Sequence, residues 1–292
     1  MKKNQIVFGH SIAVITIIIW GITYISTKVL LADFRPIEIL LIRTVIGYLI
    51  LQVMYLPRLP FADKKQEFYY ALAGLCGVNL YYLCENIALT YTYASNVGII
   101  VSVSPFFAAI FANVAFHEKH LTKNFLIGFV AAIIGIALIS FNGSATLHLN
   151  PKGDFLAFLA AILFAIYSTV VRKIGEFGHN TIQTTRRIFG YGLIFMLPIA
   201  LGMGFQWKMD AMMKLNNLWN LLFLGILASA ICFASWNKAV EVLGSVKTSI
   251  YIYLVPVITI VTSVLILHEQ ITTMAVIGTL LTLTGLFISN KR

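Results

Sequence analysis

Ten long apolar segments run through the chain and constrain its fold more than any other feature. They cover about residues 8–31, 37–56, 67–90, 95–117, 122–141, 153–172, 182–204, 216–240, 245–267 and 271–289. A helix needs roughly 20 apolar residues to cross a bilayer. Because lipid offers the backbone no hydrogen-bonding partners, we expect each segment to form a helix, which pairs its N–H and C=O groups internally. The sequence therefore predicts an all-α integral membrane protein with ten transmembrane helices.

Charged residues are few and unevenly distributed along the chain. They make up 11% of it, against 59% hydrophobic residues, whereas soluble domains average about 25% charged residues. With the N-terminus inside, thirteen Lys and Arg residues fall at cytoplasmic ends of the segments and four at outer ends. This bias predicts a multi-pass protein of a bacterial-type inner (cytoplasmic) membrane with both termini in the cytoplasm. It also explains the net charge of +10 without a nucleic-acid partner.

The second half of the chain repeats the plan of the first half. Pro105 and Pro256 lie 151 positions apart, in apolar segments of the same design. The same shift relates three further pairs, namely Asn86 and Asn237, His117 and His268, and Glu118 and Glu269. In the first helices of each half the shift is 144, as for Trp20 and Phe164. A long period that stays in phase over several helices indicates a duplicated helical unit.

The duplication divides the chain into residues 1–145 and 146–292, which we expect to form one integrated transmembrane domain. Each half carries five helices, and because five is odd, the second half enters the membrane from the opposite side. Inverted repeats are typical of secondary transporters, whose substrate site lies near the bilayer midplane between the halves. The difference between the two shifts falls around residues 206–217, where we expect an exposed loop.

Three motifs together carry a resemblance to a known family. They are the helix from Gly9 to Lys28 with Trp20-Gly21 at its centre, the stretch ALTYTYASNVGIIVSVSP at 88–105, and a His-Glu step before a Gly-containing helix, present twice. With these motifs, nearly the whole chain resembles the EamA family of the drug/metabolite transporter superfamily. One departure is His-Glu at 117–118 and 268–269 in place of the family's Gly-Glu, which we interpret as a tolerated variation.

The resemblance implies both an architecture and a function. It implies ten helices in two inverted five-helix repeats that work by alternating access. It also implies a central cavity lined mainly by the first, third, fourth, sixth, eighth and ninth helices. Many members of the family export amino acids or related metabolites, although their substrates vary widely.

Polar and aromatic residues on the predicted helices indicate a substrate site. On the third helix, Asn79, Tyr82 and Asn86 are spaced by three and four residues and so share a face. The eighth helix carries aromatic and amide side chains at corresponding positions, and the first, sixth and ninth helices add aromatic rings. The candidate substrate-binding residues are Trp20, Tyr24, Asn79, Tyr82, Glu85, Tyr167, Trp236, Asn237 and Tyr253.

Glu85 is the acidic residue placed most clearly inside a predicted span. An ionisable residue at such depth indicates a functional site. Its carboxylate would hold a substrate ammonium group, or would exchange a proton and couple transport to a proton gradient. The alternatives are a salt bridge with Lys28 or an orientation toward the outer interface. We assign Arg43 and Arg187 a structural role, with binding of a substrate carboxylate as the alternative.

Pro105 and Pro256 sit about ten residues into their helices, which is close to the midplane at 1.5 Å per residue. Proline frees the carbonyl four residues back, here that of Val101 or Ile252, and bends the helix. We interpret the two bends as shaping the cavity or as hinges for gating, and packing kinks are the alternative. Glu118 and Glu269, by contrast, fall just past helix ends on opposite membrane faces, where structural roles are expected.

Catalytic and metal-binding patterns are missing from the sequence. Cys76, Cys84 and Cys232 lie in apolar segments without Cys-x-x-Cys spacing, and all four aspartates fall in predicted loops or at the very start of a predicted helix. We therefore predict no catalytic residue, no metal site and no cofactor, and interpret the chain as not an enzyme. A membrane-embedded enzyme and a passive channel are the alternatives of a different class.

Together these patterns predict a secondary transporter that exports a small polar or amphipathic metabolite by alternating access, an amino acid or a related metabolite. An organic amine or choline-like cation is the alternative substrate, because aromatic faces attract organic cations and Glu85 would balance the charge. The expected partners are the small-molecule substrate and the lipid bilayer. The sequence leaves open the exact substrate, the direction of transport, the coupling ion, the oligomeric state (a monomer included), and whether Glu85 lies in the substrate site or in a structural ion pair.

Overall fold

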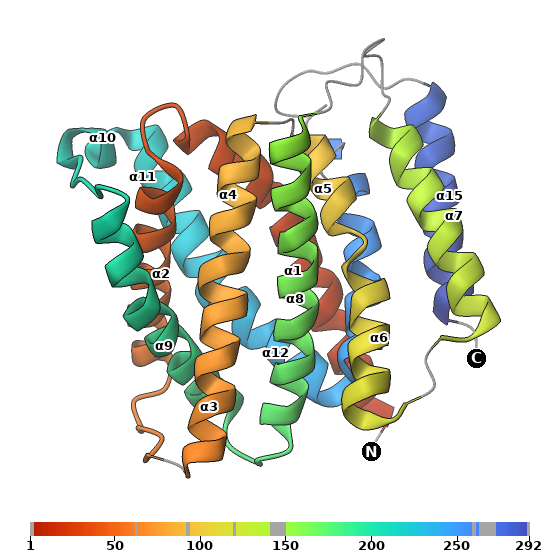
Figure 1. Cartoon of the computed structure of the whole chain (residues 1–292), viewed down its shortest axis with the longest axis horizontal. Coiled ribbons are helices and arrows are strands. Elements are labelled where there is room, and N and C mark those ends of the chain that lie inside the picture. The colour runs from red at the N-terminus through yellow and green to blue at the C-terminus, as the bar shows by residue number, and fades with distance from the viewer. Residues whose placement is uncertain are drawn as a thin grey trace.

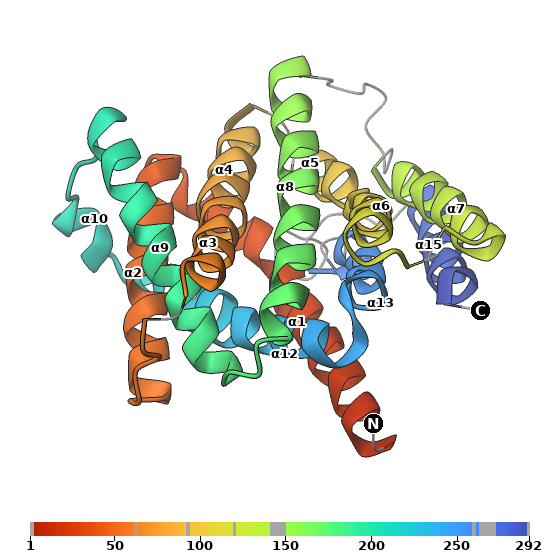
Figure 2. The same ribbon diagram turned by 60° about the horizontal axis from the view of Figure 1, so that its bottom comes forward.

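The computed structural model describes residues 3–61, 63–91, 94–118, 121–140, 150–258, 261–262 and 273–290. Helices pack side by side in a bundle, and the described residues contain no strand (Figure 1). The predicted all-α class is therefore confirmed. α7 and α15 lie together at one edge of the bundle, while α2, α9 and α10 form the opposite edge, as Figure 2 also shows.

Each of the ten predicted apolar segments contains helical structure. The first five correspond to α1 (Lys3–Leu30), α2 (Pro36–Met54), α3 (Lys64–Ala73) with η1 (Gly74–Leu80) and α4 (Tyr81–Tyr91), α5 (Ala94–Val101) with α6 (Ser104–Phe116), and α7 (Lys123–Ser140). The others correspond to α8 (Pro151–Gly175), α9 (Thr181–Gly202), α11 (Leu215–Leu222) with η2 (Phe223–Ile231) and α12 (Cys232–Leu243), α13 (Ser245–Ser249) with η3 (Ile250–Leu254), and α15 (Thr273–Asn290).

Five of these helical stretches are long and apolar enough to cross a membrane. They are Asn4–Leu30, Pro36–Met54, Lys64–Tyr91, Pro151–Gly175 and Leu215–Leu243. Shorter apolar helices cover Ser104–Phe116, Lys123–Gly135, Ser245–Ile258 and Val276–Ser289. Their many exposed Leu, Ile, Val and Phe side chains would face water in a soluble protein. The chain is accordingly a multi-pass membrane protein.

Capping residues explain where several helices begin. Asp63 accepts a hydrogen bond from the Gln66 backbone N–H at 2.9 Å and starts α3. Asn150 and Asn180 cap α8 and α9 in the same way through their side-chain oxygens. Pro36 adds a residue without an N–H in the first turn of α2, where no intrahelical partner exists for that group.

Two helices contain a π-helical stretch at corresponding positions. η1 (Gly74–Leu80) interrupts the third predicted helix, and η2 (Phe223–Ile231) interrupts the eighth. The shift of 151 found in the sequence carries residues 74–80 onto 225–231, which lie inside η2. The wider π turn changes which side chains share a face before and after it. Side-chain directions that are predicted from 100° per residue therefore do not hold across η1 and η2.

α7 and α15 pack closely through glycines. A Cβ on Gly128 would lie 2.6 Å from the Gly285 carbonyl oxygen, and a Cβ on Gly135 would lie 2.6 Å from that of Gly278. From the first contact to the second, the residue number rises by seven on α7 and falls by seven on α15. The two helices therefore run antiparallel. Small residues allow such close approach of membrane helices.

The stretch at residues 206–217, expected as an exposed loop, folds partly into the short helix α10 (Met209–Met213). It is held against the turn after α1 by Asp33. The Asn217 side-chain amide donates to the Asp33 carboxylate at 2.6 Å, and Lys214 donates to it at 2.9 Å. Lys208 donates to the Asp33 backbone carbonyl at 2.8 Å. The two connections on this end of the bundle are thereby fastened together.

We expect Gly128→Ala to destabilise the protein, because the added methyl group collides with α15. Overpacking of this kind costs about 1–3 kcal/mol, so the thermal unfolding midpoint of the detergent-solubilised protein should fall by several degrees. Gly202→Ala is the matched control, since a Cβ on Gly202 meets no atom within 4 Å. Equal midpoints for the two variants would contradict the close packing of α7 on α15.

A pH-dependent stability is expected at Asp33. Hydrogen bonds from Asn217 and Lys214 lower the pKa of this carboxyl group below its usual value. A lowered pKa in the folded state means that the contribution is present above the unfolded pKa and is lost as the pH falls through the folded pKa. The wild type should therefore exceed Asp33→Asn in unfolding temperature at neutral pH, with the difference disappearing in acid. Asp210→Asn, an exposed aspartate of α10, should show no comparable pH-dependent difference.

Candidate functional site

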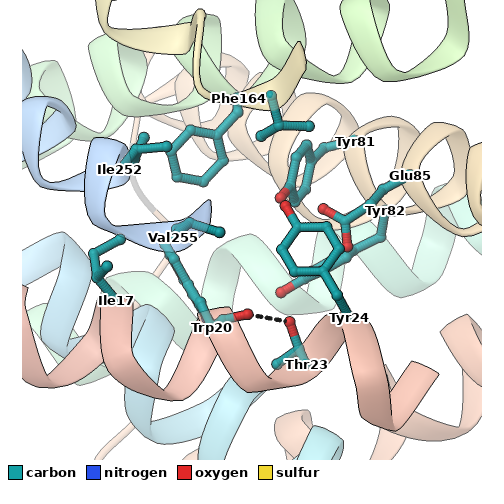
Figure 3. Close-up of a pocket in the computed structure, with 11 residues that line it drawn as sticks. Ile17, Trp20, Thr23, Tyr24, Tyr81, Tyr82, Glu85, Phe164, Ile252 and Val255 are labelled. Carbon is teal, nitrogen blue, oxygen red and sulfur yellow. Dashed lines mark hydrogen bonds between the residues drawn. The ribbon is translucent and has the colours of Figure 1, made fainter. Parts of the chain in front are cut away.

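A small pocket lies at the centre of the bundle, between α1, α4, α5, α8 and the segment around η3. Eleven side chains line it, namely Ile17, Trp20, Thr23, Tyr24, Tyr81, Tyr82, Glu85, Val101, Phe164, Ile252 and Val255 (Figure 3). Its volume is about 20 Å³, counted as the space that the centre of a water-sized sphere can occupy. That is room for about one water molecule, so the pocket is nearly filled by its own side chains.

Packed aromatic rings form one wall of this pocket. Trp20 contacts the rings of Phe164 at 5.7 Å, Phe233 at 5.5 Å and Trp236 at 5.1 Å between centroids. Its indole N–H donates to the backbone carbonyl of Ala228 at 3.0 Å. Ring contacts at these distances fix orientation as well as bury area. Trp20 thus holds α1 against α8 and η2.

Glu85 supplies the only acidic side chain among the residues that line the pocket. It is 2% exposed, and its Oε2 has no hydrogen-bond partner among the described residues. Tyr24 and Tyr81 lie beside the carboxylate with their hydroxyl groups directed into the same space (Figure 3). Lys28 donates to the backbone carbonyl of Leu89 at 2.7 Å instead of pairing with Glu85. Neither the predicted alternative of a Lys28 salt bridge nor that of an outward orientation is found.

Arg43 lies directly behind the polar side of the pocket and is completely buried. Its guanidinium donates to the hydroxyl groups of Ser229 and Tyr82, both at 3.0 Å, and stacks over the Tyr82 ring at 3.9 Å. Nη1 has no partner in the described part of the chain. In the described part of the chain, the partners of this buried cation are two hydroxyl groups and an aromatic ring.

Helix breaks at both prolines shape the pocket. α5 ends at Val101, and α6 begins at Ser104 with Pro105 in its first turn. The carbonyl of Val101, which Pro105 cannot pair, accepts from the Ser104 hydroxyl instead. In the second half the 3₁₀ helix η3 precedes Pro256, and the carbonyl of Ile252 accepts from the Val255 N–H. The predicted freeing of these two carbonyls is confirmed, and both residues line the pocket.

Two contacts fasten α1 on either side of the pocket. Toward the N-terminus, His10 Nδ1 and the Tyr251 hydroxyl are 2.7 Å apart and join α1 to η3. Toward the other end, the Lys28 ammonium bonds the Leu89 carbonyl and joins α1 to α4. Ile17, Trp20 and Tyr24 lie between these two contacts along α1. The lining residues of α1 are therefore held between one contact with η3 and one with α4.

Four of the predicted substrate-binding residues line the pocket, namely Trp20, Tyr24, Tyr82 and Glu85. Three others lie behind its wall and tie helices together. The Tyr167 hydroxyl donates to Asn237 at 2.5 Å, and the Asn237 amide donates to Thr185 at 2.9 Å. Trp236 is fully buried against Trp20 and donates to Ser168 at 3.4 Å.

Asn79 and Tyr253 lie away from the pocket. Asn79 belongs to η1 and is not among the residues that line the pocket. Tyr253 is fully buried in a separate cluster with Ala109 and Ala112 of α6. Because the pocket is lined from the first, third, fourth, sixth and ninth predicted helices, the eighth helix contributes only to its supporting layer.

Sequence reasoning omitted seven residues of the lining from its candidates. Ile17 lies three residues before Trp20, so helical spacing alone would place it on the same face. Thr23, Tyr81 and Phe164 were recognisable as neighbours or repeat counterparts of chosen residues. Val101 and Ile252 were identified only as carbonyls freed by proline, and Val255 carried no signal, because an apolar side chain in an apolar helix is not distinctive.

The arginine and glutamate at the helix ends have structural partners. Arg172 donates to both carboxylate oxygens of Glu118 and lies over the Phe116 ring at 4.3 Å. Arg187 pairs with Glu67 at 3.3 Å and donates to backbone carbonyls after α2. The structural roles predicted for Glu118 and Arg187 are confirmed. The second His-Glu step, at 268–269, lies outside the described residues.

Comparisons with known proteins agree on one class of protein, membrane transporters. The model of the EamA-like transporter family matches residues 7–141 and again residues 151–291. An "Uncharacterized transporter" of Archaeoglobus fulgidus is 26% identical over 288 residues, covering 97% of each chain. A "Probable terminal-alkyne amino-acid exporter" of Streptantibioticus cattleyicolor is 25% identical over 297 residues, covering 100% of this chain and 95% of that one. Both proteins are named as transporters.

A solved crystal structure of another protein superposes on this chain with a TM-score of 0.73. The match covers 99% of this chain and 97% of the other, at 17% identity. It shows that the two proteins share a fold over their whole length. At this identity the match says nothing about what is bound.

We expect Tyr82→Phe to destabilise the protein, because the buried Arg43 loses one of its two hydroxyl acceptors. Leaving a buried donor unpaired costs about 1–3 kcal/mol, and the thermal unfolding midpoint should fall accordingly. Tyr91→Phe removes a hydroxyl group from a tyrosine that is 48% exposed and serves as the control. An unchanged midpoint for Tyr82→Phe would show that the Arg43 contact contributes little to stability.

Proposed function

The chain belongs to the EamA-like transporter family, and we propose that it is a secondary transporter that exports amino acids or closely related small metabolites. The observation that carries this proposal is the buried Glu85 carboxylate in the central pocket, with Oε2 unpartnered among the described residues. A buried carboxylate oxygen without a hydrogen-bond partner is costly. The ammonium group of a substrate would supply a charge-assisted hydrogen bond that compensates for it.

The rest of the lining suits the remainder of such a substrate. Phe164, Ile252 and Val255 offer an apolar wall opposite Glu85 for a small side chain. Arg43 lies close enough to Glu85 for the two charges to interact, so a substrate carboxylate would also find positive charge nearby. The relative named as an exporter of a terminal-alkyne amino acid supports this class of substrate.

We propose that transport proceeds by alternating access through a closed intermediate. The small volume of the pocket, about 20 Å³, and its place between the His10–Tyr251 and Lys28–Leu89 contacts of α1 support such an intermediate. Opening toward one end would break the His10–Tyr251 contact, and opening toward the other would break the Lys28–Leu89 contact. The helix breaks before Pro105 and Pro256 are the proposed bending points.

Two inverted five-helix repeats, residues 1–145 and 146–292, are the architecture that we propose for this mechanism. The two matched stretches of the family model support it. The glycine contacts support it as well, because Gly128 and Gly135 correspond in sequence to Gly278 and Gly285. The Gly128–Gly285 contact and the Gly135–Gly278 contact are therefore equivalent to each other. Such self-complementary pairing is what a two-fold axis between the repeats produces.

Helix pairing and the two π-helices add to the support for this symmetry. α4 packs on α8, and its repeat counterpart α12 packs on α1. Ten transmembrane helices with both termini in the cytoplasm follow from this arrangement and from the positive-inside distribution. The proposed location is the cytoplasmic membrane, with a lipid bilayer and a small-molecule substrate as partners, and no cofactor is needed.

An organic amine or choline-like cation is the second candidate substrate. The observation that favours it is the ring of aromatic side chains around Glu85, made by Trp20, Tyr24, Tyr81 and Tyr82, with no cationic side chain in the lining. Aromatic faces and a carboxylate together attract organic cations. A thermal-shift screen of the purified protein with amino acids, simple amines and choline distinguishes the two, since the favoured class should raise the unfolding temperature.

Glu85→Gln tests the proposed role of the carboxylate. In proteoliposomes with the substrate found by the screen, we expect the half-saturation concentration to rise at least about tenfold, because a hydrogen bond to a charged group contributes about 1.5–3 kcal/mol. If Glu85 also exchanges the coupling proton, uphill transport driven by a proton gradient should be lost. Glu176→Gln, which removes an exposed carboxylate, should leave both quantities unchanged.

Two results would count against these proposals. Unchanged affinity and unchanged pH dependence in Glu85→Gln would remove Glu85 from the mechanism. Purely downhill flux of substrate in the wild type, insensitive to an imposed proton gradient, would rule out proton coupling and favour a passive channel.

A further inference from the structure

A second cavity, which the transport mechanism does not use, opens between the end of α2 and the start of α9. Its volume is about 460 Å³, within the range of small-molecule sites. It is lined by Tyr48, Gln52, Arg58, Leu59, Gln183, Arg186, Arg187, Gly190, Tyr191 and Ile194. None of these residues lines the central pocket. We refer to this cavity as the α2–α9 groove.

The α2–α9 groove carries an excess of positive charge. Arg58, Arg186 and Arg187 contribute three guanidinium groups to its lining, which contains no acidic side chain. Glu67 lies next to it and pairs with Arg187 at 3.3 Å. One carboxylate against three cations leaves the groove positively charged. The chemistry complementary to such a site is an anion.

Two of these arginines also hold the connection after α2. Arg186 donates to the carbonyls of Tyr55 and Pro57, both at 2.7 Å, and Arg187 donates to the Pro60 carbonyl at 3.0 Å. Carbonyl acceptors do not neutralise charge, and each guanidinium has five N–H donors. Arg58 is exposed and forms no hydrogen bond or ion pair with any residue that the structure describes. These hydrogen bonds thus fix the positions of Arg186 and Arg187 but leave their positive charge uncompensated by the carbonyl groups.

Apolar side chains continue from the mouth of the α2–α9 groove along the outside of the bundle. Leu49 and Val53 of α2 are 57% and 74% exposed, and Ile194 and Leu197 of α9 are 61% and 52% exposed. In a membrane protein these side chains face acyl chains. The two helices that line the groove therefore also present exposed apolar side chains to lipid, so basic and apolar groups are combined on them as in a site for a phospholipid.

We propose that the α2–α9 groove is a binding site for an anionic phospholipid. The phosphate and the headgroup lie against Arg58, Arg186 and Arg187, and the acyl chains run along Leu49, Val53, Ile194 and Leu197. Basic pockets between helices at the membrane surface recognise anionic headgroups in this way. The geometry also bridges α2, of the first half of the chain, and α9, of the second, so a bound lipid contacts both halves.

Native mass spectrometry of the full chain in detergent, with phosphatidylglycerol or phosphatidylcholine added, tests the site. The wild type should retain phosphatidylglycerol in preference to phosphatidylcholine. Arg58→Gln should weaken that retention about fivefold, the effect expected of one basic side chain near a membrane surface. Lys123→Gln removes the same charge from α7, at the opposite edge of the bundle (Figure 1), and should leave retention unchanged.

A second variant blocks the α2–α9 groove without changing its charge. A Cβ on Gly190 would make an ordinary 3.6 Å contact with the Tyr48 ring, so Gly190→Leu fills the groove from its floor and is compatible with folding. It should abolish the preference for phosphatidylglycerol. Gly202→Leu, on the same helix where a Cβ meets no atom within 4 Å, is its control.

Three results would overturn the proposal. Equal retention of the two lipids by the wild type would show that no anionic site exists. An equal loss in Arg58→Gln and Lys123→Gln would show general charge attraction only. Displacement of the lipid by millimolar inorganic phosphate would assign the groove to a free anion. If Gly190→Leu does not fold, the comparison of Arg58→Gln with Lys123→Gln still tests the proposal. None of these measurements depends on transport activity.

Discussion

In lipid, every backbone N–H and C=O group must find its partner inside the protein, and this constraint makes each departure from the α-helix significant. The chain departs from it at η1, η2, η3 and the break before Pro105. Each departure keeps its backbone groups paired, by π or 3₁₀ bonds or by the Ser104 hydroxyl. The breaks before the two prolines shape the pocket directly, and η1 and η2 set the faces of the helices that line or support it. The irregular backbone is thus concentrated where the site lies.

A nearly symmetric scaffold carries an asymmetric pocket. The π-helices and the proline breaks recur at corresponding positions in the two halves. The polar lining, however, comes from the first half, because Glu85 has Trp236 as its counterpart and Tyr81 has Cys232. In place of a second carboxylate, Trp236 packs on Trp20 and supports the aromatic wall. Divergence of the two halves has placed the charged group on one side of the pocket and apolar surface on the other.

Much of the fold could be predicted from the sequence because its signals are local or periodic. Runs of apolar residues predict helices in lipid, and the fixed shifts between Pro105 and Pro256 and between Trp20 and Phe164 relate the halves. The faces of the third helix could not be predicted, because a π turn leaves no mark in an apolar sequence. Asn79 was therefore placed on one face with Tyr82 and Asn86, whereas it lies in η1 and does not line the pocket. Tyr167 and Asn237 satisfy each other across two helices, a pairing that spacing within one helix does not reveal.

The sequence by itself determined the helical membrane class, the family and the repeated plan of the two halves, because each of these depends on composition or on period. Only the tertiary structure decided which side chains meet. It placed Arg43 behind Tyr82, brought Val101 and Ile252 into one pocket, and gathered three arginines between α2 and α9. Contacts between helices depend on their rotation and on the fit of their side chains, and neither is encoded in the pattern of any single helix.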